Sequence, residues 1–228
     1  MKLLLTNDDG IYAEGLWALH DHLSKRHTVV IVAPDRERSA VGHGITLEEP
    51  LRAKTISING RGSGVAVTGT PADCVKLAVV ELLDTRPDIV ISGINPGANI
   101  GININYSGTV SAAKEAALYG IPAVAASIGG RSGLHYGEAA LFIDRLIDRV
   151  KDRGLPFGTF LNVNFPDLPI RDMAGVMISR QAISILSETF EKRKDPRDQH
   201  YFWQGRDSQT VFDQPETDGA ALVASAQR

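Results

Sequence analysis

Short apolar runs alternate with helical patterns over most of this chain, and that alternation limits the possible folds more than any other feature. Apolar residues at helical spacing predict a helix over residues 13–25, and a second amphipathic pattern ends at Gly154. In "TGTPADCV", the spacing of Thr70 and Asp73 matches a capping box, which predicts another helix start. The predicted class is α/β, with a mostly parallel sheet and helices on both faces. The predicted strands span residues 2–5, 28–32, 88–91, 123–126 and 160–163.

Two segments depart from this alternation. Residues 36–67 combine loops with short antiparallel strands, which predicts a small β insertion over one edge of the sheet. After about Met177, "ETFEKRKDPRDQHYFWQGRD" mixes dense charge with Tyr201, Phe202 and Trp203. This composition fits either an extended arm that buries its aromatic residues on a partner or a solvated loop, and we favour the arm.

Composition excludes several classes of function. With 228 residues, 43% of them hydrophobic, the chain can bury a sizeable core. A net charge of -3 gives no sign of the basic stripe that binds long nucleic acid, although a nucleotide would still fit. A single cysteine excludes an internal disulfide framework and fits a reducing compartment. The N-terminal apolar run is too short for a signal sequence or a membrane span, so we expect a cytoplasmic protein without a membrane partner.

Oxygen-bearing side chains follow three of the predicted strands. Asp8 and Asp9 come directly after the first strand, while Ser39 follows the second and Asn95 the third. A sequence such as "NDDG" is by itself an ordinary turn. However, the carboxyl ends of parallel strands meet at one sheet edge, where these side chains could converge and two adjacent carboxylates would need a cation. An all-oxygen ligand set suits Mg²⁺ or Mn²⁺, whereas zinc favours sulfur or imidazole.

A second candidate feature is "NYSGTVSAAKEAALYG", a turn followed by an alanine-rich helix. Ser107 or Thr109 could simply cap that helix. In addition, Gly108 would let the backbone approach a ligand, and the helix N-terminus would attract a phosphate. Asn99 and Asn103 lie in the approach to this turn and could donate to the same anion.

Six segments together resemble the survival protein E (SurE) family of metal-dependent phosphatases. The likeness covers most of residues 1–166 in order, and it is weaker in "DPRDQHYFWQGR" and "ETDGAAL". The family pattern continues past the latter into a further strand, whereas this sequence ends at "VASAQR". The six segments are "LLLTNDDGIYAEG", "VAPDRERSAVGHGIT", "VTGTPADCV", "DIVISGINPGANIG", "YSGTVSAAKEAALYGIPAVAAS" and "FLNVNFP".

The resemblance implies a Rossmann-like fold that hydrolyses nucleoside 5′- or 3′-monophosphates and sometimes polyphosphate. It implies a catalytic domain over residues 1–185 and an oligomerisation arm over residues 186–228, exchanged in homodimers or homotetramers. One divalent ion per subunit, Mg²⁺ or Mn²⁺, is expected. The residues that match the family's metal ligands are Asp8, Asp9, Ser39 and Asn95, and those that match its phosphate-binding positions are Asn99, Ser107, Gly108 and Thr109.

The expected mechanism is attack of a water, activated by the ion, in line on phosphorus. Asp8 and Asp9 are the expected catalytic residues, with Asp9 as the general base, and the start of the alanine-rich helix would stabilise the transferring group. Two alternatives remain at this point. A nucleotide sensor would bind the same ligand without hydrolysing it, and a structural oligomer would depend on the charged, aromatic arm.

Overall fold

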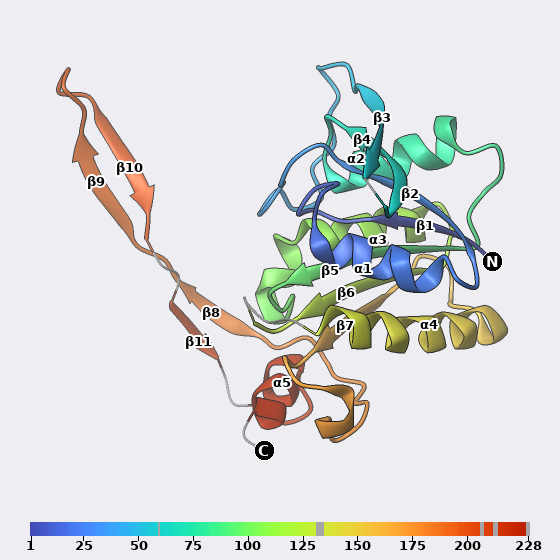
Figure 1. Cartoon of the computed structure of the whole chain (residues 1–228). Coiled ribbons are helices and arrows are strands. Elements are labelled where there is room, and N and C mark those ends of the chain that lie inside the picture. Colours follow the sequence, from blue (N-terminus) through green and yellow to red (C-terminus); the bar gives the residue numbers. More distant parts are fainter. Residues whose placement is uncertain (59, 131–134, 206–207, 212–213, 227–228) are drawn as a thin grey trace.

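The computed structural model describes residues 1–58, 60–130, 135–205, 208–211 and 214–226. A seven-stranded sheet in the order β3-β4-β2-β1-β5-β6-β7 forms the centre of the molecule (Figure 1). All its neighbouring strands are parallel except β3 and β4. This confirms the predicted α/β class. The strands are β1 (Lys2–Thr6), β2 (Thr28–Pro34), β3 (Ala53–Ile58), β4 (Gly62–Val67), β5 (Ile89–Pro96), β6 (Ala123–Ile128) and β7 (Leu161–Phe165).

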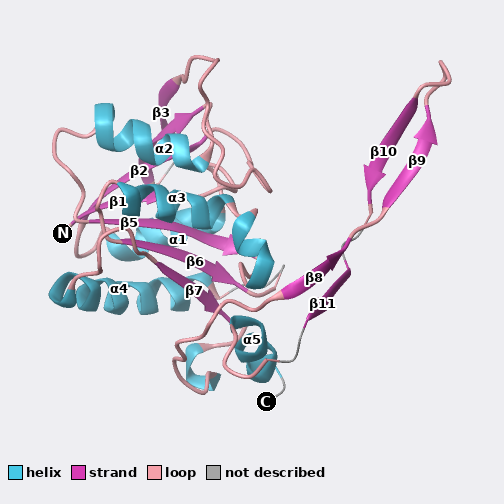
Figure 2. Ribbon diagram, turned by 180° about the vertical axis from the view of Figure 1, so that it is seen from behind, coloured by secondary structure: helices cyan, strands magenta, loops and turns pink. Residues whose placement is uncertain are grey.

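Helices cover both faces of the sheet (Figure 2). Leu3 and Leu5 of β1 pack in one core cluster with α1 (Glu14–Leu23) and α4 (Tyr136–Arg153). Leu4 points to the opposite face, as the period of a strand requires, and packs with α2 (Pro71–Leu77) and α3 (Gly108–Leu118). Burial of such a leucine contributes about 1.5–3 kcal/mol to stability. None of the described helices is long and apolar enough to cross a membrane.

The helix ends follow the signals in the sequence. Thr70 and Asp73 form the predicted capping box at the start of α2, and Gly154 ends α4 with a φ of 71°. Short helical segments complete the connections. They are the π-helical Ala78–Leu82, which continues α2, and the 3₁₀ segments η2 (Gly101–Asn105) and η3 (Ile170–Asp172).

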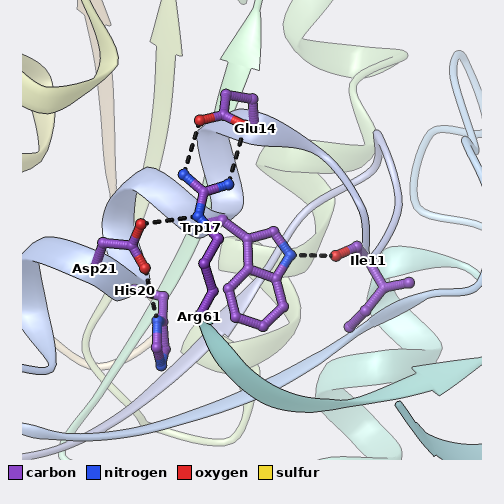
Figure 3. Close-up of polar contacts among 6 residues, drawn as sticks. All are labelled: Ile11, Glu14, Trp17, His20, Asp21 and Arg61. Carbon is purple, nitrogen blue, oxygen red and sulfur yellow. Dashed lines mark hydrogen bonds and ion pairs between the residues drawn. The ribbon is translucent and has the colours of Figure 1, made fainter. Parts of the chain in front are cut away.

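The predicted β insertion is present, and it extends the sheet at its edge. Its second strand, β4, pairs in parallel with β2, and β3 adds an antiparallel edge strand. Arg61 in the hairpin turn contacts both carboxylate oxygens of Glu14, at 2.9 and 3.0 Å, and one oxygen of Asp21 at 3.0 Å (Figure 3). These ion pairs fix the hairpin to α1, whose first residues follow the candidate site.

The C-terminal region forms an extended arm, which projects far from the sheet in Figures 1 and 2. β8 (Ser184–Ser187) pairs with β11 (Ser208–Val211), and β9 (Phe190–Lys194) pairs with β10 (His200–Gln204), both antiparallel. The chain then returns to the body through α5 (Asp218–Ala226). The extended shape agrees with the favoured interpretation of this segment, and the burial of its aromatic residues on a partner stays a prediction.

Candidate active site

The candidate site lies where the chain reverses direction across the sheet. From β1 the chain proceeds to β2 on one side, and it later returns to place β5 on the other side of β1. In open α/β sheets, ligands bind at the carboxyl ends of the strands beside such a switch point. Asp8 and Asp9 follow β1 directly, and Asn95 lies at the end of β5. The topology therefore places these predicted residues at the same edge of the sheet.

Asp8 is joined directly to the start of α3. The side chain of Thr109 donates a hydrogen bond of 2.5 Å from Oγ1 to Asp8 Oδ1. A Cβ atom added to Gly108 would lie only 2.7 Å from the Cβ of Asp8, so this contact requires glycine. The expected metal ligand and the expected phosphate-binding turn are thus in contact.

The segment that carries Ser39 packs against the same turn. The backbone N–H of Arg38 donates to the carbonyl oxygen of Asp8 at 2.7 Å. Gly10 has a φ of 97°, and a Cβ there would lie 2.9 Å from the backbone of Arg36. Backbone contacts therefore hold the Ser39 segment close to the two aspartates.

Asp9 is a carboxylate in a setting that disfavours its charge. Burial, and then the neighbouring charges of Asp8 and Glu37, raise the pKa of Asp9 to about 7. Burial also raises the pKa of Asp8, although hydrogen bonds from Thr109 oppose this effect. The Oδ2 atom of Asp9 is buried, and the described residues supply it with no hydrogen-bond partner. A bound cation would satisfy that oxygen and neutralise the pair.

The donor set fits a hard divalent cation. The amide nitrogen of Asn95 donates to the carbonyl of Gly97 at 2.6 Å, which leaves the amide oxygen as the atom able to bind a cation. Among the described residues, no three or more His, Cys, Asp or Glu side chains are grouped to hold a metal. The site therefore depends on two carboxylates and neutral oxygens, which suits Mg²⁺ or Mn²⁺.

Ser107 and Thr109 have different roles at the start of α3. Ser107 is the N-cap, since its Oγ accepts a hydrogen bond from the N–H of Val110 at 3.1 Å. Its carbonyl oxygen accepts from the hydroxyl of Ser111. Thr109 is completely buried and directs its hydroxyl to Asp8. Of the two cap candidates in the sequence, the structure selects Ser107.

Comparison with known proteins identifies the family. A family model described as "Survival protein SurE" matches residues 3–188, most of the chain. This chain belongs to the SurE family. The resemblance that the sequence motifs indicated is thereby confirmed.

Close relatives of this SurE-family chain carry the name of an enzyme. It is 57% identical over 223 residues to the 5′-nucleotidase SurE of Desulfatibacillum aliphaticivorans, which covers 97% of this chain and 88% of that protein. It is 48% identical over 223 residues to the 5′-nucleotidase SurE of Syntrophobacter fumaroxidans, with coverage of 98% and 89%. The crystal structure of the SurE protein from Aquifex aeolicus superposes with a TM-score of 0.81 at 38% identity, covering 99% of this chain and 90% of that one.

Asn99 of this SurE-family chain is held by asparagines that our sequence analysis did not single out. The backbone N–H of Asn99 donates to Asn164 Oδ1 at 2.8 Å, and its carbonyl oxygen accepts from Asn164 and Asn162 at 3.1 and 2.9 Å. Its side chain donates to Ser127 at 2.8 Å. Among the described residues, the hydrogen bonds of Asn99 thus lead to β6 and β7, and none links it to the Ser107–Thr109 turn. The two asparagines lie at alternate positions of "FLNVNFP" and so share one strand face. That pattern in the sequence could have indicated that they act together.

Proposed function

We propose that this protein is a divalent-metal-dependent phosphomonoesterase that hydrolyses nucleoside 5′-monophosphates to nucleoside and phosphate. The proposal extends to nucleoside 3′-monophosphates and short polyphosphate as further substrates. The names of its relatives support a 5′-nucleotidase. The observation that carries the proposal is the contact of Asp8 with Gly108 and Thr109, beside the Asp9 oxygen that has no hydrogen-bond partner among the described residues. A cation on the aspartates would adjoin a phosphate on the helix start.

In this proposal one Mg²⁺ or Mn²⁺ per subunit is held by oxygen atoms of four side chains. When bound, such an ion neutralises charge on a phosphate and makes water a better nucleophile. Asp9 is also the proposed general base, because its carboxylate lies beside the proposed ion. The four proposed ligands are Asp8, Asp9, Ser39 and Asn95.

The chain's own residues orient the substrate. Ser107, Gly108 and Thr109 begin α3, where free backbone N–H groups and the helix dipole attract an anion. The hydroxyl of Thr109 donates to Asp8, and its backbone N–H also interacts with that carboxylate, so we assign Thr109 to the orientation of Asp8 and to a phosphate contact directly beside it. Asn99 is the fourth proposed phosphate contact, through the side-chain atoms that Ser127 does not engage.

We further propose that residues 1–185 form the catalytic domain and residues 186–228 an arm for assembly into homodimers or homotetramers. The arm is well suited to a partner because it exposes large aromatic side chains. Phe190, Phe202 and Trp203 are each about 60% exposed. Monomeric proteins rarely expose such apolar surface.

The direct test is phosphate release from a panel of nucleoside 5′- and 3′-monophosphates with Mn²⁺, with Mg²⁺ and with EDTA. We expect metal-dependent release by the wild type and a loss of about 100-fold or more in Asp8→Asn. Asp152→Asn, an exposed change of the same kind on α4, is the matched control and should retain activity. Nucleotide that binds with metal but stays intact would contradict the hydrolase and favour a sensor.

A further inference from the structure

Ser39 makes a short hydrogen bond to a carboxylate that the proposed ligand set does not include. The hydroxyl of Ser39 donates to Glu37 Oε1 at 2.5 Å. Both residues are exposed at the sheet edge, on the segment that Arg38 ties to the backbone of Asp8. The contact therefore lies at the rim of the candidate metal site.

A neutral hydroxyl can bind a cation only through its oxygen lone pairs, so its proton must point away from the ion. A free serine side chain rotates among several rotamers and hydroxyl orientations. A carboxylate that accepts the hydroxyl proton fixes both. Partners of this kind commonly orient the ligands of protein metal sites.

We propose that Glu37 is a positioning residue that holds the Ser39 hydroxyl with its oxygen lone pairs available to the divalent cation beside Asp8 and Asp9. This inference rests on the proposed metal site. Thr109 has the corresponding relation to Asp8, because it donates to one carboxylate oxygen and leaves the other available. Each of these two ligands would thus be oriented by a neighbour.

Electrostatics place the Glu37 carboxylate within reach of the same site. Burial is the largest cause that raises the pKa of both aspartates, and for Asp9 the charge of Asp8 comes next. The charge of Glu37 also raises both pKa values. Its negative charge would therefore also strengthen the attraction of a cation. We do not assign Glu37 as a ligand itself, because the described residues contain no group of three acidic, His or Cys side chains that could hold a metal ion.

The test is a calorimetric titration of the full-length, metal-free protein with Mn²⁺. Glu37→Ala should weaken Mn²⁺ binding about tenfold, the lower end for such partners because Glu37 is exposed. Glu37→Gln keeps an acceptor for Ser39 but loses the charge, so its effect should be smaller. Glu48→Ala removes an exposed charge from the same insertion and should change affinity by less than about twofold. The thermal midpoints of all variants in EDTA should match that of the wild type.

A double-mutant cycle tests whether Glu37 acts through Ser39. In a Ser39→Ala background, Glu37→Ala should lower the Mn²⁺ affinity by no more than Glu37→Gln lowers it in the wild-type background, which is the effect of the charge alone. A full tenfold loss in that background would overturn the positioning role, as would wild-type affinity in Glu37→Ala alone. Failure of the wild type to bind Mn²⁺ would instead refute the proposed metal site, and this inference with it.

Discussion

At the scale of single residues, the two adjacent aspartates have different environments. Asp8 is nearly inaccessible and receives the hydroxyl of Thr109. Asp9 is partly exposed and keeps one buried oxygen without a partner among the described residues. An unpaired buried carboxylate oxygen costs free energy, and the proposed cation would offset that cost. The same cation would offset the repulsion between the two aspartates of "NDDG".

Replacing Thr109 tests the orientation of Asp8. Thr109→Val keeps the shape of the buried side chain but removes the hydrogen bond to a charged oxygen, worth about 1.5–3 kcal/mol. We expect phosphate release to fall about 10- to 100-fold with weaker Mn²⁺ binding, measured by steady-state kinetics and calorimetry. Thr109→Ser retains the hydroxyl and should retain most of the activity. Equal losses in both variants would show that the hydrogen bond is not what matters.

At the scale of elements, β7 holds the loop that follows β5. Asn164 contacts both the N–H and the carbonyl of Asn99. Asn164→Ala would leave the backbone N–H of Asn99 unpaired, whereas Asn162 would still donate to the carbonyl, and should destabilise the protein by about 1–3 kcal/mol. Because this loop leads from Asn95 to Ser107, we also expect a higher KM. Asn105→Ala, which removes an exposed side-chain bond to the carbonyl of Ile102, is the control and should leave KM unchanged.

Asp144 connects α4 to the end of α1 and gives a pH-dependent contribution to stability. It is buried, and it accepts from Arg26 at 2.8 Å and pairs with His27 at 2.9 Å. Burial alone would raise the pKa of Asp144, but these hydrogen bonds lower it below its usual value. A carboxyl group whose pKa is lowered by folding stabilises the folded state at pH values above its pKa in the unfolded chain. This stability is lost as the pH falls toward the pKa in the folded state.

We therefore expect Asp144→Asn to lower the free energy of unfolding by about 1–2 kcal/mol at pH 7. The difference from the wild type should shrink below about pH 4, as the wild-type carboxyl becomes protonated. Urea denaturation at both pH values measures it. Asp148→Asn removes a half-exposed partner of Arg26 and should have an effect below about 0.5 kcal/mol. A constant difference at all pH values would contradict the assignment.

The hydrophobic periodicity of the sequence predicted the helices and strands well, but it did not predict the side-chain contacts. All five expected strands are present, and β1, β5 and β6 are almost entirely buried, whereas β7 is mostly only partly buried. β5 runs past its expected end at Ile91, since Asn95 still pairs with Ser127 of β6. The positions of Asp8, Asp9 and Asn95 near strand ends predicted, from the sequence alone, that they share one edge of the sheet. The bonds of Thr109 to Asp8 and of Glu37 to Ser39 depend on how loops fold back, which no local pattern encodes.

At the scale of the whole molecule, the arm is the proposed surface for assembly. Phe202→Ser combined with Trp203→Ser removes two exposed aromatic residues of β10. We expect subunit association to weaken about 10- to 100-fold, because buried aromatic anchors dominate interfaces. Light scattering after size exclusion measures the mass. Phe157→Ser, which changes a residue 82% exposed outside the arm, should leave the assembly intact. An unchanged mass in the double variant would argue against assembly through this arm.

We propose that a divalent cation binds at the carboxyl ends of β1 and β5, against the start of α3. The most direct measurement is an anomalous difference map from crystals soaked in Mn²⁺. We predict one peak per subunit, within about 2.0–2.4 Å of oxygen atoms of Asp8, Asp9, Ser39 and Asn95. A peak held by other residues, or no peak in crystals that still release phosphate, would contradict this cation site.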